Sequence, residues 1–315
     1  MDYPDNNPLV TAVITTHNRK DLVLNAIASA QNQTYSNLEI IVVDDHSTDG
    51  TKEIIEKYIN GTSICYIYNT DDLGGNHIRN IGIMAAKGDC VAFLDDDDEW
   101  FPEKIERQVA FIRQNPRVGA VFCGRIMVWD SGERRKSDLS LLPNGDYSQK
   151  IFKGCFFSTS CFFVKKELLL QCNMFDESLK YWQEFELYMR LAQITQFGSV
   201  MDHLVLFRCA SVKGSTKRLS YNLSGWPDAV DYVNQKHNEK IKQLPEDILK
   251  KYKLYIANDG CRRSVRAGNK KELHRYLKEL YQINPNFINL TGLLINHYIS
   301  SLNIKKRIFF MFKNR

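Results

Sequence analysis

The sequence lacks the marks of several common classes of protein. None of its eight cysteines forms a Cys-x-x-Cys pair, and several lie in apolar runs, which favours reduced thiols in a reducing compartment over disulfides or a zinc site. No apolar run approaches the roughly 18 residues that a transmembrane helix needs. Met1 is followed by acidic residues and a proline, not by the basic and then apolar stretch of a signal peptide. We therefore expect a protein that starts and stays in the cytosol.

Glycine-rich nucleotide-binding loops are also missing. A Rossmann dinucleotide site needs Gly-x-Gly-x-x-Gly after the first strand, and a P-loop needs Gly-x-x-x-x-Gly-Lys-Ser/Thr. The first apolar segment is instead followed by Thr15-Thr16-His17-Asn18-Arg19, which excludes the first motif, and the second occurs nowhere in the chain. The net charge of +5 is small for 315 residues, so we expect no nucleic-acid partner.

What the sequence does contain is a regular alternation of two patterns through its first half. Apolar, β-branched segments alternate with segments that have apolar residues at helical spacing. Strands separated by helices form right-handed βαβ units, so the pattern predicts an α/β fold with a mainly parallel, Rossmann-like sheet flanked by helices. The predicted strands are 9–16, 38–45, 63–68, 90–94 and 118–123, and the predicted helices are 20–33, 48–58, 74–86 and one that begins near Pro102.

The second half is less regular. Residues 125–150 are polar and contain glycine and proline, which predicts an excursion or hairpin over the site. A helix is predicted at 184–192 and a last strand at 200–207, and His203 is expected to be a structural residue. From about Trp226 the pattern is helical and rich in lysine. We therefore expect a catalytic domain over 1–220 and a helical C-terminal region over 221–315.

Four consecutive aspartates, Asp95-Asp96-Asp97-Asp98, end the apolar segment that begins at Cys90. Adjacent carboxylates repel one another, so their grouping at a strand end indicates that they serve a cation. Mg²⁺ and Mn²⁺ take oxygen ligands, and Mg²⁺ is usually held by one or two carboxylates together with substrate phosphates. The run therefore predicts a metal and diphosphate site at the carboxyl end of a buried strand.

Polar residues follow the other predicted strands as well. Hydroxyls and amides end the first strand at 15–19, carboxylates end the second at 44–47, and a Gly-Gly pair opens the helix after the third. In open α/β sheets ligands bind beyond the carboxyl ends of the strands, so all of these groups are expected at one edge. Hydroxyls, a carboxylate, a cation and a metal site together predict a pocket for a nucleoside diphosphate.

Four segments in this order resemble the family 2 inverting glycosyltransferases of the GT-A fold, of the kind found in bacterial polysaccharide biosynthesis. The segments are VITTHNR at 13–19, IVVDDHSTDGT at 41–51, GNHIRNIG at 75–82 and FLDDDD at 93–98. The resemblance extends over roughly residues 9–210. It implies the GT-A fold and a reaction that moves a sugar from a nucleotide to an acceptor.

The resemblance also implies roles for residues that would hold the donor. Thr15 and Asp45 match positions that hold the nucleobase, with Asp45 accepting from the base N3–H. Arg79 matches a cation near the nucleotide. Asp95 and Asp96 are expected at the ribose and metal side.

The metal itself is expected on Asp97, which matches the last aspartate of the family's Asp-x-Asp motif, with Mn²⁺ or Mg²⁺ as the cofactor. Asp98 lies beyond that frame and is expected to matter less. Many relatives carry a late histidine near the metal, and here the matching segment reads Phe-Arg-Cys-Ala at 207–210. His17 and His46 are expected to support the pocket and not to bind the metal.

The resemblance places the catalytic base at the start of the helix near 184. Family members usually carry a Glu-Asp pair there, and this chain has Gln183 and Glu184. Glu184 keeps the carboxylate with one more methylene group and is expected to take the proton of the acceptor hydroxyl. Glu186 is the alternative base, but two residues further along a helix it should face away from Glu184.

The substrates implied are a nucleotide sugar, with a UDP-sugar favoured, and a glycan or lipid-linked glycan acceptor. The Gln-x-x-Arg-Trp motif of processive relatives is absent, which indicates the addition of a single sugar. No acid follows Glu279, and residues 286–313 are basic, aromatic and amphipathic. This segment predicts either an anchor on an anionic membrane, at the inner face of the plasma membrane, or a helix packed on the rest of the protein.

Two other functions stay open from the residues alone. A sugar-phosphate nucleotidyltransferase has a similar sheet, but its glycine-rich first loop with a basic residue is not supplied by residues 15–19. A degenerate sugar-nucleotide-binding scaffold is favoured only by the changed Gln183-Glu184 pair.

Overall fold

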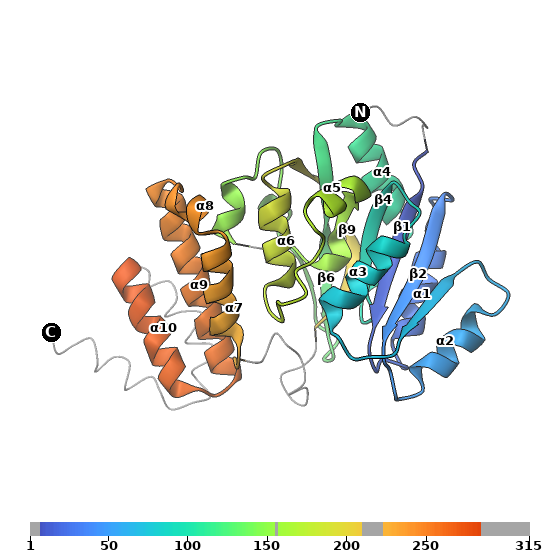
Figure 1. Ribbon diagram of the computed structural model, residues 1–315, viewed down its shortest axis with the longest axis horizontal. Coiled ribbons are helices and arrows are strands. Elements are labelled where there is room, and N and C mark those ends of the chain that lie inside the picture. Colours follow the sequence, from blue (N-terminus) through green and yellow to red (C-terminus); the bar gives the residue numbers. More distant parts are fainter. Residues whose placement is uncertain (1–6, 155–156, 210–222, 285–315) are drawn as a thin grey trace. The chain divides into compact units, whose positions relative to one another are not determined.

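The computed structural model describes residues 7–154, 157–209 and 223–284 (Figure 1). The chain divides into two compact units, the first made of residues 1–151 with 155–215 and the second of 152–154 with 216–315. The predicted boundary at residue 220 and the predicted membrane-binding segment at 286–313 lie outside the described residues. Within the described part of the chain, no helix combines the length and the apolar character needed to cross a membrane.

The first unit contains one mixed sheet. Its strands lie in the order β3-β2-β1-β4-β8-β6-β9-β5, and β7 pairs with β6. Pairing is parallel from β3 to β4 and between β6 and β9, and antiparallel where β8, β5 and β7 join their neighbours. The bounds are β1 Val10–Thr16, β2 Leu38–Asp45, β3 Cys65–Asn69, β4 Cys90–Asp95, β5 Glu99–Trp100, β6 Val118–Trp129, β7 Arg134–Lys136, β8 Phe163–Lys165 and β9 Gln196–Cys209.

Helices cover both faces of this sheet, because successive side chains of a strand point to opposite faces. On β1, Val10, Ala12 and Ile14 belong to one buried cluster together with residues of α1 and α4. On the other face α3 approaches β1 so closely that a Cβ at Gly82 would meet Val13 at 2.3 Å. The helices of this unit are α1 Val23–Gln31, α2 Thr51–Ile59, α3 Gly75–Ala85, α4 Lys104–Gln114, α5 Lys166–Gln171 and α6 Gln183–Leu191.

The second unit is helical in its described residues. A Cβ at Gly260 would meet the ring of Tyr276 at 2.6 Å, so α9 and α10 pack tightly against each other. The ring of Tyr276 also packs edge-on against Trp226. The helices are α7 Trp226–Lys236, α8 Asn238–Lys242, α9 Glu246–Arg266 and α10 Lys270–Ile283.

The predicted fold class is confirmed: the molecule is a mixed α/β sheet with mostly parallel strands flanked by helices, followed by C-terminal helices. The strand predicted at 38–45 matches β2 at both ends. The polar stretch after residue 125 continues β6 to Trp129 and then turns back through β7, so a hairpin occupies its beginning.

The last strand is longer than predicted. His203 lies inside β9, which begins at Gln196, four residues before the predicted start at 200. The strand starts earlier because β6 pairs with it from Val118 onward. The ring of His203 contacts the carbonyl oxygen of Ser137 at 3.0 Å.

Candidate active site

The parallel strands bring their carboxyl ends to one edge of the sheet. Thr15 of β1 pairs with Val43 on one side and with Asp95 on the other, and Thr16 pairs with Asp44. The predicted donor-binding residues Thr15 and Asp95 are therefore direct neighbours on the adjacent strands β1 and β4. Asp45 is the last residue of β2 at the same edge.

The loops that follow β1 and β2 are fastened to each other by side chains. The amide of Asn18 donates to Oγ of Ser47 at 2.8 Å, and the amide of Thr48 donates to Oδ1 of Asn18 at 2.8 Å. Asn18 has a φ of 53°, a left-handed conformation that asparagine tolerates better than most residues. These bonds fix the loops after β1 and β2 relative to each other at the edge of the candidate site.

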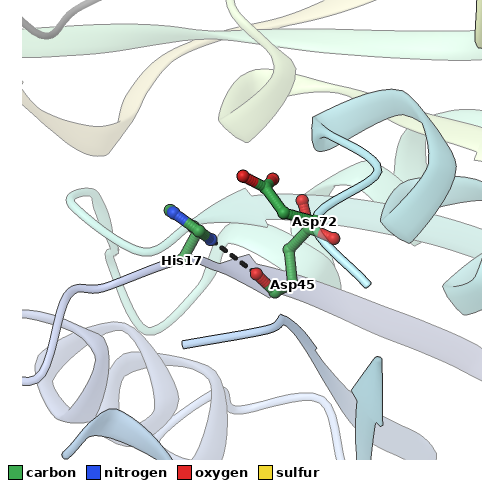
Figure 2. Close-up of side chains that lie close together, drawn as sticks. All are labelled: His17, Asp45 and Asp72. Carbon is green, nitrogen blue, oxygen red and sulfur yellow. Dashed lines mark hydrogen bonds between the residues drawn. The ribbon is translucent and has the colours of Figure 1, made fainter. Parts of the chain in front are cut away.

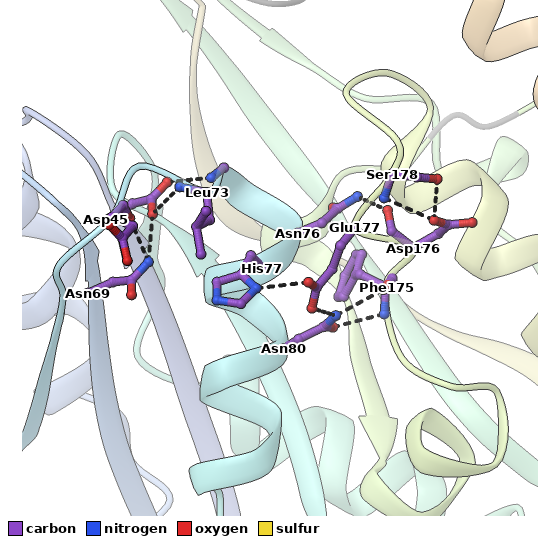
Figure 3. Close-up of polar contacts among 12 residues, drawn as sticks. Asp45, Asn69, Leu73, Asn76, His77, Asn80, Phe175, Asp176, Glu177 and Ser178 are labelled. Carbon is purple, nitrogen blue, oxygen red and sulfur yellow. Dashed lines mark hydrogen bonds and ion pairs between the residues drawn. The ribbon is translucent and has the colours of Figure 1, made fainter.

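Asp45 is buried, and its carboxylate anchors the loop between β3 and α3 (Figure 3). Its Oδ2 accepts from the amide of Gly74 at 2.8 Å. Its Oδ1 accepts from the amide of Leu73 at 3.2 Å and from Nδ2 of Asn69 at 3.3 Å. A carboxylate has about four acceptor positions, so the contacts of the described residues leave one position on Oδ2.

His17, Asp45 and Asp72 form a cluster whose candidate ligand atoms lie within 4.8 Å of one another (Figure 2). The Nδ1 of His17 contacts the carbonyl oxygen of Asp45, and Nδ2 of Asn18 contacts Nε2 at 2.8 Å. Because a carbonyl only accepts and an amide nitrogen only donates, the ring carries its proton on Nδ1 and accepts at Nε2. Both ring nitrogens are therefore engaged, which favours the predicted supporting role of His17. The approach of Asp72 was not anticipated, although the Asp-Asp pair at 71–72 is visible in the sequence.

Asp98 serves a different purpose from the other aspartates of the run. It is 1% exposed, and burial raises the pKa of its carboxyl group well above the usual value. Its Oδ2 accepts from the hydroxyl of Ser160 at 2.6 Å, and its Oδ1 accepts from the amide of Arg208 at 3.1 Å. Asp98 thus ties the turn after β4 to β9.

Asp95 forms an ion pair with Arg79 of α3, with Nη2 of the guanidinium 2.9 Å from Oδ1. Nη1 of the same group donates to Oε1 of Gln183 at 3.1 Å. Burial disfavours the cation, but the carboxylates of Asp95 and Glu184 outweigh that effect and place the pKa of Arg79 above its usual range. Arg79 therefore links β4, at the predicted metal side, to the start of α6.

Asp96 and Asp97 are half-buried side by side. Burial and then the neighbouring Asp97 carboxylate raise the pKa of Asp96 to about 7. The amide of His17 lies 3.4 Å from Oδ2 of Asp96. Crowded carboxylate oxygens at a strand end are the ligands that Mg²⁺ and Mn²⁺ prefer, and a cation there would relieve the repulsion. The residues present therefore fit a divalent metal ion.

Glu184 and Glu186 lie in the first turn of α6, with different surroundings. Oε1 of Glu184 accepts from the hydroxyl of Thr159 at 2.7 Å. Glu186 is fully buried, and Arg190 donates to both of its oxygens, through Nε at 2.9 Å and Nη2 at 2.6 Å. The two oxygens of Glu186 are thus committed to holding α6 together.

The segment that leads into α6 is held by two amide side chains of α3, a contact that the sequence analysis missed (Figure 3). Nδ2 of Asn80 donates to the carbonyl of Phe175 at 2.9 Å, and the amide of Phe175 donates back to Oδ1 at 2.9 Å. Nδ2 of Asn76 donates to the carbonyl of Leu179 at 3.0 Å. The sequence did contain a signal for this contact. Two asparagines stand four positions apart in a predicted helix, where asparagine is unfavourable because of its low helix propensity.

We expect Asn80→Ala to lower the free energy of unfolding by about 1–3 kcal/mol, because the buried amide and carbonyl of Phe175 both lose their partner. His77→Ala is the control, since it removes only the exposed ion pair with Glu177, which is worth at most about 1 kcal/mol. Urea denaturation measures both variants, and hydrogen exchange in segment 175–179 locates the effect. Equal losses of unfolding free energy in the two variants would contradict the inference that Asn80 holds the segment before α6.

Comparison with known proteins agrees with this geometry. The family model "Glycosyl transferase family 2" matches residues 11–172. The putative colanic acid biosynthesis glycosyl transferase WcaA of Escherichia coli K12 is 31% identical over 196 residues, which cover 61% of this chain and 68% of that protein. The UDP-Glc:alpha-D-GlcNAc-diphosphoundecaprenol beta-1,3-glucosyltransferase WfaP of Escherichia coli is 43% identical over 104 residues, 33% of this chain and 41% of that protein.

Solved structures share the fold. Residues 1–349 of Staphylococcus aureus TarS superpose with a TM-score of 0.64 at 19% identity, over 88% of this chain and 81% of that one. The mannosyltransferase PcManGT of Pyrobaculum calidifontis, in complex with GDP-Man and Mn²⁺, gives a TM-score of 0.58 at 18% identity, over 98% and 85%. The site edge, the family model and these relatives agree, and the chain belongs to glycosyl transferase family 2 as a glycosyltransferase with a GT-A-like fold.

Proposed function

We propose that this glycosyltransferase moves a single sugar from a UDP-sugar to a lipid-linked glycan, with inversion at the anomeric carbon and with Mn²⁺ or Mg²⁺ bound at Asp97. The observation that carries the proposal is the arrangement around Arg79. Its guanidinium pairs with Asp95 at the donor side and binds Gln183, the residue before Glu184. This arrangement supports a leaving-group site near Asp95 and a base at Glu184, linked through Arg79 at the edge of the sheet.

The hydrogen bonds of Asp45 support a pyrimidine donor. Oδ1 already accepts twice, and only Oδ2 retains an acceptor position among the described contacts. The imide edge of uracil presents one N–H, which fits one position, whereas the edge of guanine presents two N–H donors that need both oxygens. Thr15, which lies beside Asp95 on the neighbouring strand, is proposed to contact the same nucleoside. The name of the relative WfaP also gives UDP-Glc as a donor.

Asp95 and Asp96 are proposed to lie at the ribose and metal side. Asp97 is the proposed direct ligand, because it matches the last aspartate of the family's Asp-x-Asp motif and lies just after the end of β4 beside Asp96. The chemistry that a bound Mn²⁺ or Mg²⁺ supplies is neutralisation of the charge that develops on the departing diphosphate. The Mn²⁺ in PcManGT supports this choice.

Glu184 is the proposed base. One of its oxygens accepts from Thr159, and the other remains for the proton of an acceptor hydroxyl. As that proton moves to Glu184, the acceptor oxygen bonds to the anomeric carbon and the bond to the diphosphate breaks on the opposite face.

Residues 1–220 are proposed as the catalytic domain and 221–315 as a helical region whose basic end meets an anionic membrane. The support is the absence of acids after Glu279 and the diphosphoundecaprenol acceptor in the name of WfaP. A lipid-linked acceptor places the reaction at a membrane surface, which would make the protein peripheral at the inner face of the plasma membrane.

We expect Asp97→Ala to abolish transfer and the Mn²⁺-dependent part of UDP binding, because the remaining carboxylates cannot recreate the same chelate geometry. Asp72→Ala is the matched control, since it removes an exposed carboxylate from the His17 cluster and should leave the metal dependence intact. Calorimetric titration of UDP with and without Mn²⁺ compares them. If Asp72→Ala removes the dependence and Asp97→Ala does not, the ion belongs to the His17 cluster.

Calorimetry also tests the nucleobase. We expect UDP to bind at least about 10-fold more tightly than GDP, and Asp45→Asn to weaken UDP binding by roughly 1.5–3 kcal/mol through the loss of a charge-assisted hydrogen bond. Asp89→Asn, at the opposite end of β4, is the control. Equal binding of GDP and UDP would refute the proposal that Asp45 accepts a single N–H group from a pyrimidine base.

The reaction is tested with UDP-glucose, UDP-galactose and their N-acetyl forms, Mn²⁺, and a synthetic GlcNAc-diphosphoryl lipid. We expect one sugar to be added, with an inverted anomeric configuration by NMR, and Glu184→Gln to lower turnover by roughly 10²–10⁴-fold with little change in UDP affinity. A retained configuration, or full activity of Glu184→Gln, would show that another mechanism or base operates.

A further inference from the structure

A single turn of 3-10 helix, η3 at Thr159–Cys161, contacts both halves of the proposed site. Oγ1 of Thr159 donates to Oε1 of Glu184 at 2.7 Å. The next residue, Ser160, donates to Oδ2 of Asp98 at 2.6 Å and accepts from the amide of Asp95 at 3.2 Å. Two consecutive hydroxyl groups therefore reach the proposed base and the aspartate run.

The turn that presents these hydroxyls is firmly fixed. Thr159 and Ser160 are 1% and 0% exposed. The carbonyl of Ser160 accepts from Nε1 of Trp100 at 2.9 Å, and the carbonyl of Thr159 accepts from the amide of Phe162 at 2.9 Å. Phe162 leads directly into β8, which pairs with β4 and β6 in the sheet. A hydroxyl held by this turn has a defined position relative to the ends of the strands.

Glutamate needs such a support more than aspartate would. Its side chain has three rotatable bonds, so an unrestrained carboxylate could occupy several positions at the start of α6. The bond from Thr159 fixes one oxygen and directs the other. General-base catalysis requires the accepting oxygen within hydrogen-bond reach of the acceptor hydroxyl, so the orientation of this carboxylate bears directly on turnover.

We propose that Thr159 is a positioning residue for Glu184, which holds the longer carboxylate of this chain at a fixed separation from the aspartate run. The inference rests on the proposed role of Glu184 as the base. Thr159 touches no reacting atom in this scheme and acts only through Glu184.

The central test is Thr159→Val, which keeps the shape of the side chain and removes the hydroxyl. With the UDP-sugar and GlcNAc-diphosphoryl lipid described above, we expect kcat to fall by roughly 10-fold to 10²-fold, the scale of a misplaced catalytic group, while KM for the donor stays within about 2-fold. Thr159→Ser restores the hydroxyl and should recover most of kcat. Thr159→Ala, which removes the hydroxyl without adding volume, should lower kcat in the same way if valine destabilises the turn.

A double-mutant cycle separates positioning from general structural damage. If Thr159 acts through Glu184, the double variant Thr159→Val with Glu184→Gln should be no slower than Glu184→Gln alone. Thr11→Val is the matched control, because it removes a fully buried hydroxyl that bonds to Glu39 and Gly88 at the opposite end of β1. It should leave kcat unchanged even if it lowers the melting temperature.

The outcomes distinguish this inference from the proposed function. Normal kcat in Thr159→Val, no rescue by serine, or an additive loss in the double variant would overturn the positioning role while Glu184 remains the base. Full activity of Glu184→Gln would overturn the assignment of the base itself, and with it the reason for a positioning residue.

Discussion

The candidate site depends on a partly buried ion pair, between Arg79 on α3 and Asp95 at the end of β4. Removing these charges from water is costly, and the cost is repaid only with close geometry and further hydrogen bonds. Gln183 supplies one of those bonds from the start of α6. Because three elements meet at one guanidinium, Arg79 helps to fix the proposed donor side relative to the proposed base.

Neutral side chains complete the arrangement. The amides of Asn76 and Asn80 hold the segment before α6, and the hydroxyls of Thr159 and Ser160 hold the carboxylates on either side. These groups bind backbone and carboxylate atoms without adding charge to a site that is proposed to accept a diphosphate as well. Neutral side chains thus supply part of the scaffold around the proposed chemistry, and neutral groups cost less to bury than ions do.

Four identical residues in a row have three different environments. Asp95 is paired with a cation, Asp96 and Asp97 lie close enough to repel each other, and Asp98 is buried and accepts two hydrogen bonds. Adjacent residues leaving a strand point in different directions and meet different neighbours. Identity in the sequence therefore does not predict equal roles.

The sequence by itself determined the architecture and the family, because the alternation of strand and helix patterns and the order of four motifs are local properties of the chain. It also brought Thr15 and Asp95 to one edge, since parallel strands align their carboxyl ends. Only the tertiary structure decided which distant groups meet. Thr159 and Glu184 are 25 positions apart, and Asn80 and Phe175 are 95 apart. Such contacts depend on how helices pack on the sheet, which periodicity and composition do not encode.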